Sequence, residues 1–261
     1  MKRLNKTFRP GWRAVKKPKK EPLAQALVNR SLAPTLERAR PLIMTGNVIV
    51  DDHMIDKPGT LVSPTARIRL KTAPSAYVSR GGEKLEKPLG DFALQVRDKT
   101  ILDVGASTGG FSDCLLQHGA RLVYAVDVGY GQLAWKLQTD PRVIALERTN
   151  IRSLSADDFD PKPDCAVIDA SFISLQKIIG HVAGLLVPGS IIIGLIKPQF
   201  EAKKGSVDKG GIVRDPALYR DVIAGVTKTA LALSLQVVGI TESPIQGQKG
   251  NREFFIVCRK P

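Results

Sequence analysis

The sequence predicts an α/β protein with a doubly wound, mostly parallel sheet, preceded by a smaller α+β module and a basic arm. Three observations lead to this prediction. Strand-like and helix-like segments alternate after residue 85, residues 21–72 suggest two helices followed by short strands, and positive charge is concentrated in residues 1–20. A chain of 261 residues with 43% hydrophobic residues is long enough for both a substantial domain and a smaller one.

The arm, residues 1–20, carries nine Lys or Arg and no acidic residue, whereas the whole chain has a formal net charge of +14. It contains no apolar run long enough for a secretory signal, which favours a disordered arm. Clustered cations with Phe8 and Trp12 between them are typical of a segment that binds nucleic acid. A solubilising tail is the alternative.

The small module, residues 21–72, should begin with two short helices that end at Gly46. Short strands should follow, around turns at Asp51 and Asp52 and at Pro58 and Gly59. The expected apolar helix faces contain Leu23, Leu27 and Val28 in the first helix and Leu36, Ala39, Leu42 and Ile43 in the second.

This order of elements resembles the S-four-type RNA-binding domain, which implies that a helical face and a hairpin contact structured RNA. The first helix lacks the basic start that is usual in that family and begins with EPLAQAL instead. The module is therefore nearly neutral, and the basic arm is a plausible compensation.

A linker, residues 73–84, contains a proline and paired glycines, which mark a boundary. In the large domain, residues 85–261, ligands should bind at the carboxyl ends of the parallel strands. The last two strands are joined by a loop alone, so we expect an antiparallel hairpin at the sheet edge. The predicted strands are 100–105, 121–128, 142–146, 165–171, 190–196, 235–243 and 253–258, with helices expected from Phe111, near Leu133, from Leu175 and from Ala217.

The longest apolar stretch, LLVPGSIIIGLI, is shorter than the roughly 20 residues that a membrane span needs. Cys114, Cys165 and Cys258 are far apart and have no paired spacing. They predict neither a zinc site nor a disulfide framework, and we expect reduced thiols in a cytoplasmic protein.

The stretch TILDVGASTGGFSDCLLQHGA runs from a strand through a glycine-rich loop into a helix. Such a loop can hold a dinucleotide, a triphosphate or S-adenosylmethionine. Gly110 and Phe111 stand where a P-loop has lysine and a hydroxyl residue, and the spacing after Gly105 does not match GxGxxG. Asp103 and Asp127, at the ends of two successive strands, could bind an ammonium group and ribose hydroxyls.

These features resemble the cofactor site of class I S-adenosylmethionine methyltransferases. The resemblance implies a Rossmann-like sheet of seven strands and S-adenosylmethionine as the cofactor. The residues that it implies at the cofactor are Asp103, Gly105, Ser107, Gly109, Asp127, Val128 and Asn150.

Four charged residues of the linker and the large domain are candidate catalytic residues. Asp169, Lys197 and Glu253 lie at the ends of predicted strands, and Lys84 lies in the linker. Their order resembles the catalytic tetrad of FtsJ-like ribose 2′-O-methyltransferases. The resemblance implies direct methyl transfer to a ribose hydroxyl without a metal. Lys197 would act as a base or an orienter, Asp169 would orient Lys197, and Lys84 and Glu253 would orient the hydroxyl.

The strings YVSRGGEKLEK, VIDASFISL, IKPQFEA and PIQGQKGNREF are similar to the TlyA, or haemolysin A, family, and the resemblance extends over nearly everything from Pro22 onward. It implies methylation of cytidine 2′-hydroxyls in small- or large-subunit ribosomal RNA. The partner would be ribosomal RNA or a ribosomal subunit, with no membrane. Which cytidines are modified, and whether the protein is a monomer or a weak homodimer, stay open. The alternatives are a membrane-lytic protein and a ribosome-binding factor without turnover.

Overall fold

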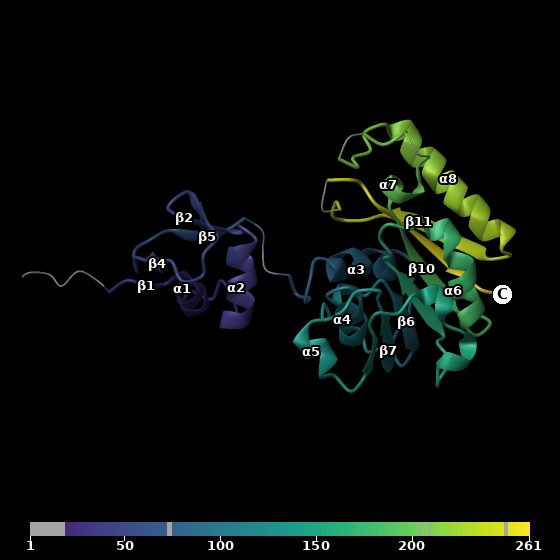
Figure 1. The fold of residues 1–261 in the computed structure, drawn as a ribbon, viewed down its shortest axis with the longest axis horizontal. Coiled ribbons are helices and arrows are strands. Elements are labelled where there is room, and N and C mark those ends of the chain that lie inside the picture. Colours follow the sequence, from purple (N-terminus) through teal and green to yellow (C-terminus); the bar gives the residue numbers. More distant parts are fainter. Residues whose placement is uncertain (1–18, 72–74, 204, 209, 248–249) are drawn as a thin grey trace, which may run out of the picture. The chain divides into compact units, whose positions relative to one another are not determined.

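The computed structural model describes residues 19–71, 75–203, 205–208, 210–247 and 250–261. The chain divides into two compact units, residues 1–74 and 75–261, which we describe separately (Figure 1). Almost all of the predicted arm lies outside the described residues. The part of the predicted linker from residue 75 onward belongs to the larger unit.

The smaller unit contains two helices, a three-stranded antiparallel sheet in the order β3-β2-β5, and the strand pair β1-β4. Its core is formed by apolar residues of both helices and of β2 and β4. The elements are β1 (Glu21–Pro22), α1 (Leu23–Asn29), α2 (Leu36–Met44), β2 (Val48–Val50), β3 (His53–Ile55), β4 (Leu61–Val62) and β5 (Ile68–Leu70).

The expected turns of the small module are confirmed. Asp51 and Asp52 have φ values of 45° and 66°, as a tight two-residue hairpin between β2 and β3 requires. Gly46, with φ of 67°, follows α2 in the left-handed conformation that ends helices. One apolar position is wrong, because Leu36 is 40% exposed. Leu36 is the first residue of α2, and a helical side chain leans toward the N-terminus, here past the end of the helix.

The larger unit contains the predicted seven-stranded sheet, in the order β11-β12-β10-β9-β6-β7-β8. The sheet is parallel apart from β12, which pairs antiparallel with both β10 and β11. The predicted hairpin at the sheet edge is therefore confirmed. The strands are β6 (Thr100–Val104), β7 (Leu122–Val126), β8 (Val143–Leu146), β9 (Cys165–Ile168), β10 (Ile191–Ile196), β11 (Gln236–Glu242) and β12 (Phe254–Arg259).

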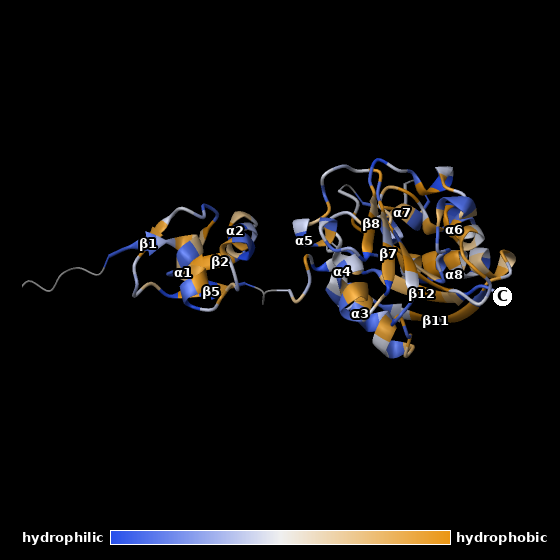
Figure 2. Cartoon of the chain, turned by 90° about the horizontal axis from the view of Figure 1, so that it is seen from below, coloured by the Kyte–Doolittle hydropathy of each residue, from blue (hydrophilic) through white to orange (hydrophobic). Residues whose placement is uncertain are grey.

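Helices cover both faces of this sheet (Figure 1), and the strands between them are mostly apolar (Figure 2). Residues of α3, α4 and α5 pack on one face, and residues of α6 and α8 pack on the other. The helices are α3 (Gly81–Asp91), α4 (Gly110–Gln117), α5 (Trp135–Gln138), α6 (Ile179–Leu185), α7 (Pro198–Glu201) and α8 (Pro216–Ala232), with 3-10 turns at Ile151–Ser153, Ala156–Asp158 and Leu175–Lys177. The helix expected from Leu175 thus starts as a 3-10 turn, and α6 follows from Ile179.

Strand register brings residues that are far apart in the sequence to the carboxyl ends of the parallel strands. Val104 of β6 pairs with Val126 of β7 and with Ile168 of β9. In the antiparallel pair, Ile196 at the end of β10 lies opposite Phe254 at the start of β12. The residues just beyond these positions therefore converge at the carboxyl ends of the parallel strands, where ligands bind in open α/β sheets.

Candidate active site

The loop between β6 and α4 lies against the end of β9. Gly105 has φ of +84°, and a Cβ there would stand 2.8 Å from the Asp169 carbonyl oxygen. Gly109 has φ of +90°, and a Cβ there would stand 2.1 Å from Leu137 Cδ1. Both positions need glycine for the backbone conformation and for space. The loop is consequently held close to both β9 and α5.

Asp103 is fully buried on the sheet face that α4 covers. Ser112 Oγ donates a 2.6 Å hydrogen bond to Asp103 Oδ2, whereas Asp103 Oδ1 has no hydrogen-bond partner among the described residues. Burial raises the pKa of Asp103 to about 7, and the nearby Asp169 and Asp127 add to the rise. A buried carboxylate oxygen without a partner fits the ammonium group of S-adenosylmethionine.

Asp127 follows β7 and holds the glycine-rich loop. The backbone N–H of Ser107 donates to Asp127 Oδ2 at 2.8 Å, and that of Gly129 donates to Asp127 Oδ1 at 2.7 Å. Each carboxylate oxygen keeps a lone pair for a further donor such as a ribose hydroxyl. The predicted cofactor residues Val128 and Asn150 lie beside Asp127 and after β8, respectively, and Val128 is exposed.

Lys84 of α3 forms an ion pair with Glu253, which immediately precedes β12. Their Nζ and Oε2 atoms lie 2.6 Å apart, and the side chains are only 12% and 3% exposed. Because both partners are largely buried, removing either one would leave an uncompensated charge away from water, which is costly. The pair joins the linker end of the larger unit to its last strand.

Lys197 and Asp169 form the second pair, after the ends of β10 and β9. Their Nζ and Oδ1 atoms lie 2.6 Å apart, in an ion pair rather than a well-directed hydrogen bond. Lys197 Nζ also donates to the Asp169 carbonyl at 3.2 Å and to Ser171 Oγ at 2.9 Å. The ammonium group therefore has three oxygen atoms within 3.2 Å, two of which accept hydrogen bonds from it.

The structure thus brings the four tetrad residues together as two lysine–carboxylate pairs. The register places Lys197 opposite Glu253, one position beyond the pair formed by Ile196 and Phe254. Sequence reasoning missed Ser112 and Ser171, the hydroxyl partners of Asp103 and Lys197. Neither serine forms a motif of its own, and only the strand–helix and strand–strand contacts reveal its role.

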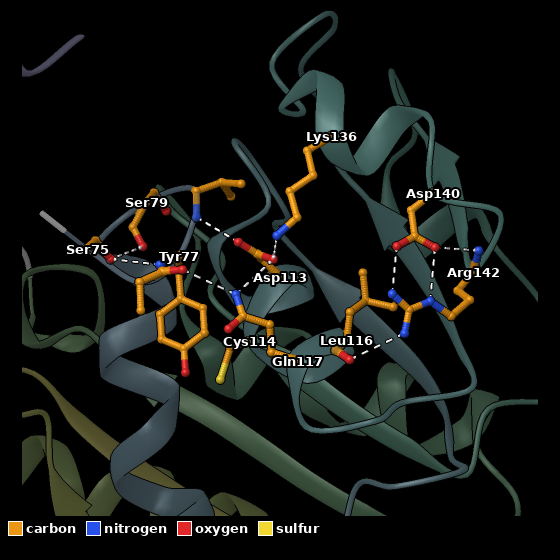
Figure 3. Close-up of polar contacts among 12 residues, drawn as sticks. Ser75, Tyr77, Ser79, Asp113, Cys114, Leu116, Gln117, Lys136, Asp140 and Arg142 are labelled. Carbon is orange, nitrogen blue, oxygen red and sulfur yellow. Dashed lines mark hydrogen bonds and ion pairs between the residues drawn. The ribbon is translucent and has the colours of Figure 1, made fainter. Parts of the chain in front are cut away.

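Sequence reasoning also missed Asp113, whose side chain joins the linker to α4 and α5 (Figure 3). This residue of α4 is fully buried and accepts a 2.8 Å hydrogen bond from the backbone N–H of Val78. Lys136 of α5 and Gln117 of α4 donate to its other oxygen at 2.7 Å and 3.2 Å. A buried acid in an otherwise amphipathic helix is the signal that could have indicated such a role.

A groove of about 610 Å³ is lined by residues of the 3-10 turns at Ile151–Ser153 and Leu175–Lys177, of α7 and of the loop after β9. Phe172 on its rim is 92% exposed, and its ring centroid lies 5.4 Å from that of Phe200. Arg152 and Lys177 add positive charge to the same groove. An exposed aromatic ring next to cations is a suitable surface for a nucleic-acid base.

The seven-stranded sheet, the glycine loop and the two acids at strand ends define an α/β protein of the methyltransferase type. The model of the FtsJ-like methyltransferase family matches residues 77–260. The chain therefore belongs to the FtsJ-like methyltransferase family.

Relatives extend the similarity into the smaller unit. A Bacillus subtilis (strain 168) protein with the provisional name rRNA methyltransferase YqxC is 49% identical over 93% of this chain and 87% of its own. The 16S/23S rRNA (cytidine-2'-O)-methyltransferase TlyA of Mycobacterium tuberculosis is 44% identical over 89% of this chain and 87% of its own. A solved structure from Streptococcus thermophilus, provisionally named a hemolysin, has a TM-score of 0.73 and 43% identity and covers 93% of this chain and 89% of its own.

Within the described part of the chain, no helix combines the length and the apolar character that crossing a membrane requires.

Proposed function

We propose that this protein transfers a methyl group from S-adenosylmethionine to cytidine 2′-hydroxyls of ribosomal RNA, in the cytoplasm where ribosomes are made. One observation supports this most strongly. Two largely buried lysine–carboxylate pairs lie at the carboxyl ends of the parallel strands, where Asp103 and the glycine loop also lie. The substrate is inferred from the relative named a 16S/23S rRNA (cytidine-2'-O)-methyltransferase.

The residues of the glycine loop fit the cofactor. Asp103 would hold the ammonium group, since its buried Oδ1 has no partner among the described residues. Asp127 would accept hydrogen bonds from the ribose hydroxyls. The loop residues Gly105, Ser107 and Gly109 would let the backbone come close to the cofactor. Val128 and Asn150 would lie on either side of the adenosine. When bound, S-adenosylmethionine supplies an electrophilic methyl group.

Lys197 would hold the attacking hydroxyl oxygen. Its ammonium group already donates to the Asp169 carbonyl and to Ser171 Oγ and is ion-paired with the Asp169 carboxylate, so the substrate oxygen would replace one of the two neutral acceptors. Asp169 keeps the ammonium in place, and base catalysis would require Lys197 to release a proton first. Lys84 and Glu253 would position the ribose from the other side of the site.

The smaller unit would bind RNA as an S-four-type domain, residues 21–72, with help from the basic arm. The Phe172 ring would stack on a base of the same RNA beside the active site. The proposed methyl transfer requires no metal ion.

The proposal can be tested with purified protein, ribosomal subunits and radiolabelled S-adenosylmethionine, followed by reverse-transcription mapping of ribose methylation. Lys197→Ala should lower turnover by at least about 100-fold, the usual scale of a lost proton-handling group, while calorimetry shows unchanged cofactor binding. Lys87→Ala is a matched control, because Lys87 is also ion-paired, with Asp91 at 2.6 Å, but at the surface. Cofactor binding without ribose methylation of any subunit would contradict the proposal.

A further inference from the structure

We propose that Glu86, Cys114 and His118 form a binding site for one Zn²⁺ ion between α3 and α4. Each residue offers one ligand atom, and these atoms all lie within 4.8 Å of one another. The sulfur, nitrogen and oxygen donors belong to none of the groups that we assign to methyl transfer. The site would be structural or regulatory, and it goes beyond the proposed enzymatic function.

The two helices create this cluster. Cys114 and His118 are four residues apart at the C-terminal half of α4, so their side chains lie on one face. Glu86 belongs to α3, which packs directly against α4. Cys114 is fully buried, whereas the Glu86 and His118 side chains are 45% and 37% exposed. An ion could therefore enter from solvent past the two half-exposed ligands.

Each outer ligand is already oriented by a second hydrogen bond. His118 Nδ1 lies 2.9 Å from the Cys114 carbonyl oxygen and 3.7 Å from Cys114 Sγ, whereas Nε2 lies near Glu86 Oε2. With the proton on Nδ1, which the carbonyl favours, Nε2 keeps a lone pair for a metal ion. Tyr77 donates to Glu86 Oε1, so Oε2 is the carboxylate oxygen that faces His118. Partners of this kind, a carbonyl for histidine and a donor for the carboxylate, are typical around protein-bound zinc.

The spacing of the two outer ligands matches that of a zinc site. His118 Nε2 and Glu86 Oε2 lie 3.4 Å apart. A tetrahedral zinc ion separates its N and O ligands by about 3.3 to 3.5 Å, as bonds of about 2.0–2.2 Å imply. The observed spacing therefore suits a zinc ion bound by both atoms, and the nearby thiol offers a third ligand.

Cys114 supplies the preference for zinc. Thiolate with imidazole and carboxylate is a donor set for Zn²⁺, not for Mg²⁺ or Ca²⁺, and water would complete the four ligands. Burial raises the pKa of Cys114 to about 12, so the metal-free protein carries the thiol. Binding forms the Zn–S bond, and the S–H proton leaves to solvent.

No zinc motif is visible in the sequence, because the proposed ligands come from two helical segments and have no paired cysteine spacing. A bound ion would tie α3, which carries Lys84, to α4, which follows the cofactor loop. Zinc should therefore raise the thermal stability of the larger unit.

Cobalt is the appropriate probe, because Co²⁺ replaces Zn²⁺ and its thiolate complexes absorb in the near ultraviolet. The full chain, free of tags and kept reduced without added thiols, should develop this band and saturate at one equivalent of Co²⁺. Zinc should then abolish the band by displacement. Cys114→Ser should remove it, and His118→Gln and Glu86→Gln should each weaken cobalt binding at least about 10-fold.

Two variants serve as matched controls. His53→Gln changes an exposed histidine of the smaller unit, and Cys258→Ala removes a buried thiol of the larger unit. Both should keep the wild-type cobalt affinity, with circular dichroism confirming that every variant is folded. The proposal is overturned if the wild type shows no thiolate band at excess Co²⁺, if the band survives Cys114→Ser, or if His53→Gln weakens binding as much as His118→Gln.

Discussion

Asp103 is a proposed cofactor residue whose chemistry is strongly altered by its position. Burial, with the nearby carboxylates of Asp169 and Asp127, raises its pKa from the ordinary 3.8 to about 7. Its contribution to the stability of the cofactor-free fold is therefore greatest below pH 3.8 and is lost as the pH rises through about 7. A bound ammonium group would reverse this preference by favouring the ionised carboxylate.

Cofactor affinity should accordingly rise with pH through about 7. Below that pH, binding must displace a proton from Asp103, which costs up to about 10-fold in affinity for each pH unit. Titration calorimetry between about pH 5.5 and 7.5 keeps the cofactor amine charged and measures this slope. Asp103→Asn should bind weakly and lose the pH dependence. A wild-type affinity that is flat over this range would contradict the assigned role.

The buried ion pair of Lys84 and Glu253 makes a prediction about stability. Glu253→Gln removes the charge opposite an ammonium group that is only 12% exposed. The free energy of unfolding should fall by about 3 kcal/mol, because the remaining charge is buried without its partner. Urea denaturation of this variant, of Lys84→Met and of the double variant should show a double-mutant loss well below the sum of the single losses. Additive losses would mean that the two side chains do not interact.

At the residue scale, the sequence predicted candidate residues but not how they pair. Asp103, Asp127 and the proposed tetrad were singled out by their positions near strand ends, where ligands bind in open α/β sheets, and by their order along the chain. The ion pair of Lys84 with Glu253 spans 169 positions and depends on how α3 packs against β12. No local pattern contains that contact, and the same holds for Ser112 and Ser171.

Among the elements, the loop between β6 and α4 is the most constrained. The approach of Gly105 to the Asp169 carbonyl links this loop to the second ion pair. A side chain at Gly105 would push on the backbone of Asp169 and so on the position of its carboxylate.

Gly105→Ala should lower the free energy of unfolding by at least about 2 kcal/mol, because the residue keeps a φ of +84° and its Cβ meets backbone at 2.8 Å. Methyl transfer should fall with it. Gly184→Ala is the matched control in α6, since a Cβ there meets nothing within 4 Å. That change should stabilise the protein by about 0.5 kcal/mol. Thermal and urea unfolding of both variants measure the difference, and equal effects would contradict this reasoning.

Element prediction succeeded where hydrophobic pattern dominates and failed at short segments. The seven strands of the large sheet have apolar runs that set them apart from the loops, and the structure confirms all of them. The helix expected near Leu133 is a single turn that begins at Trp135, and β1 with two residues was not predicted. Such pieces are formed by contacts with neighbouring segments rather than by their own propensity.

Over the whole molecule, charge is the least evenly distributed property. The arm, residues 1–20, holds nine of the basic residues, and the proposed active site lies entirely in the larger unit. Substrate affinity and chemistry should therefore be separable.

Deletion of residues 1–20 should reduce the salt dependence of RNA binding. If about half of the nine charges contact phosphates, the slope of log affinity against log salt should fall by about 3 to 4 units. Methyl transfer at saturating RNA should remain near the full-length rate. Filter binding from about 50 to 300 mM salt measures the slope. An unchanged affinity and slope would identify the arm as a solubilising or targeting tail.

The position of β12 has a consequence for how the chain acquires its shape during synthesis. Because β12 lies between β10 and β11, those two earlier strands emerge from the ribosome with facing edges that remain unpaired until the last strand arrives. Such open edges invite association with other nascent chains. Glu253 immediately precedes β12, so the proposed tetrad cannot assemble before residue 253 has been translated.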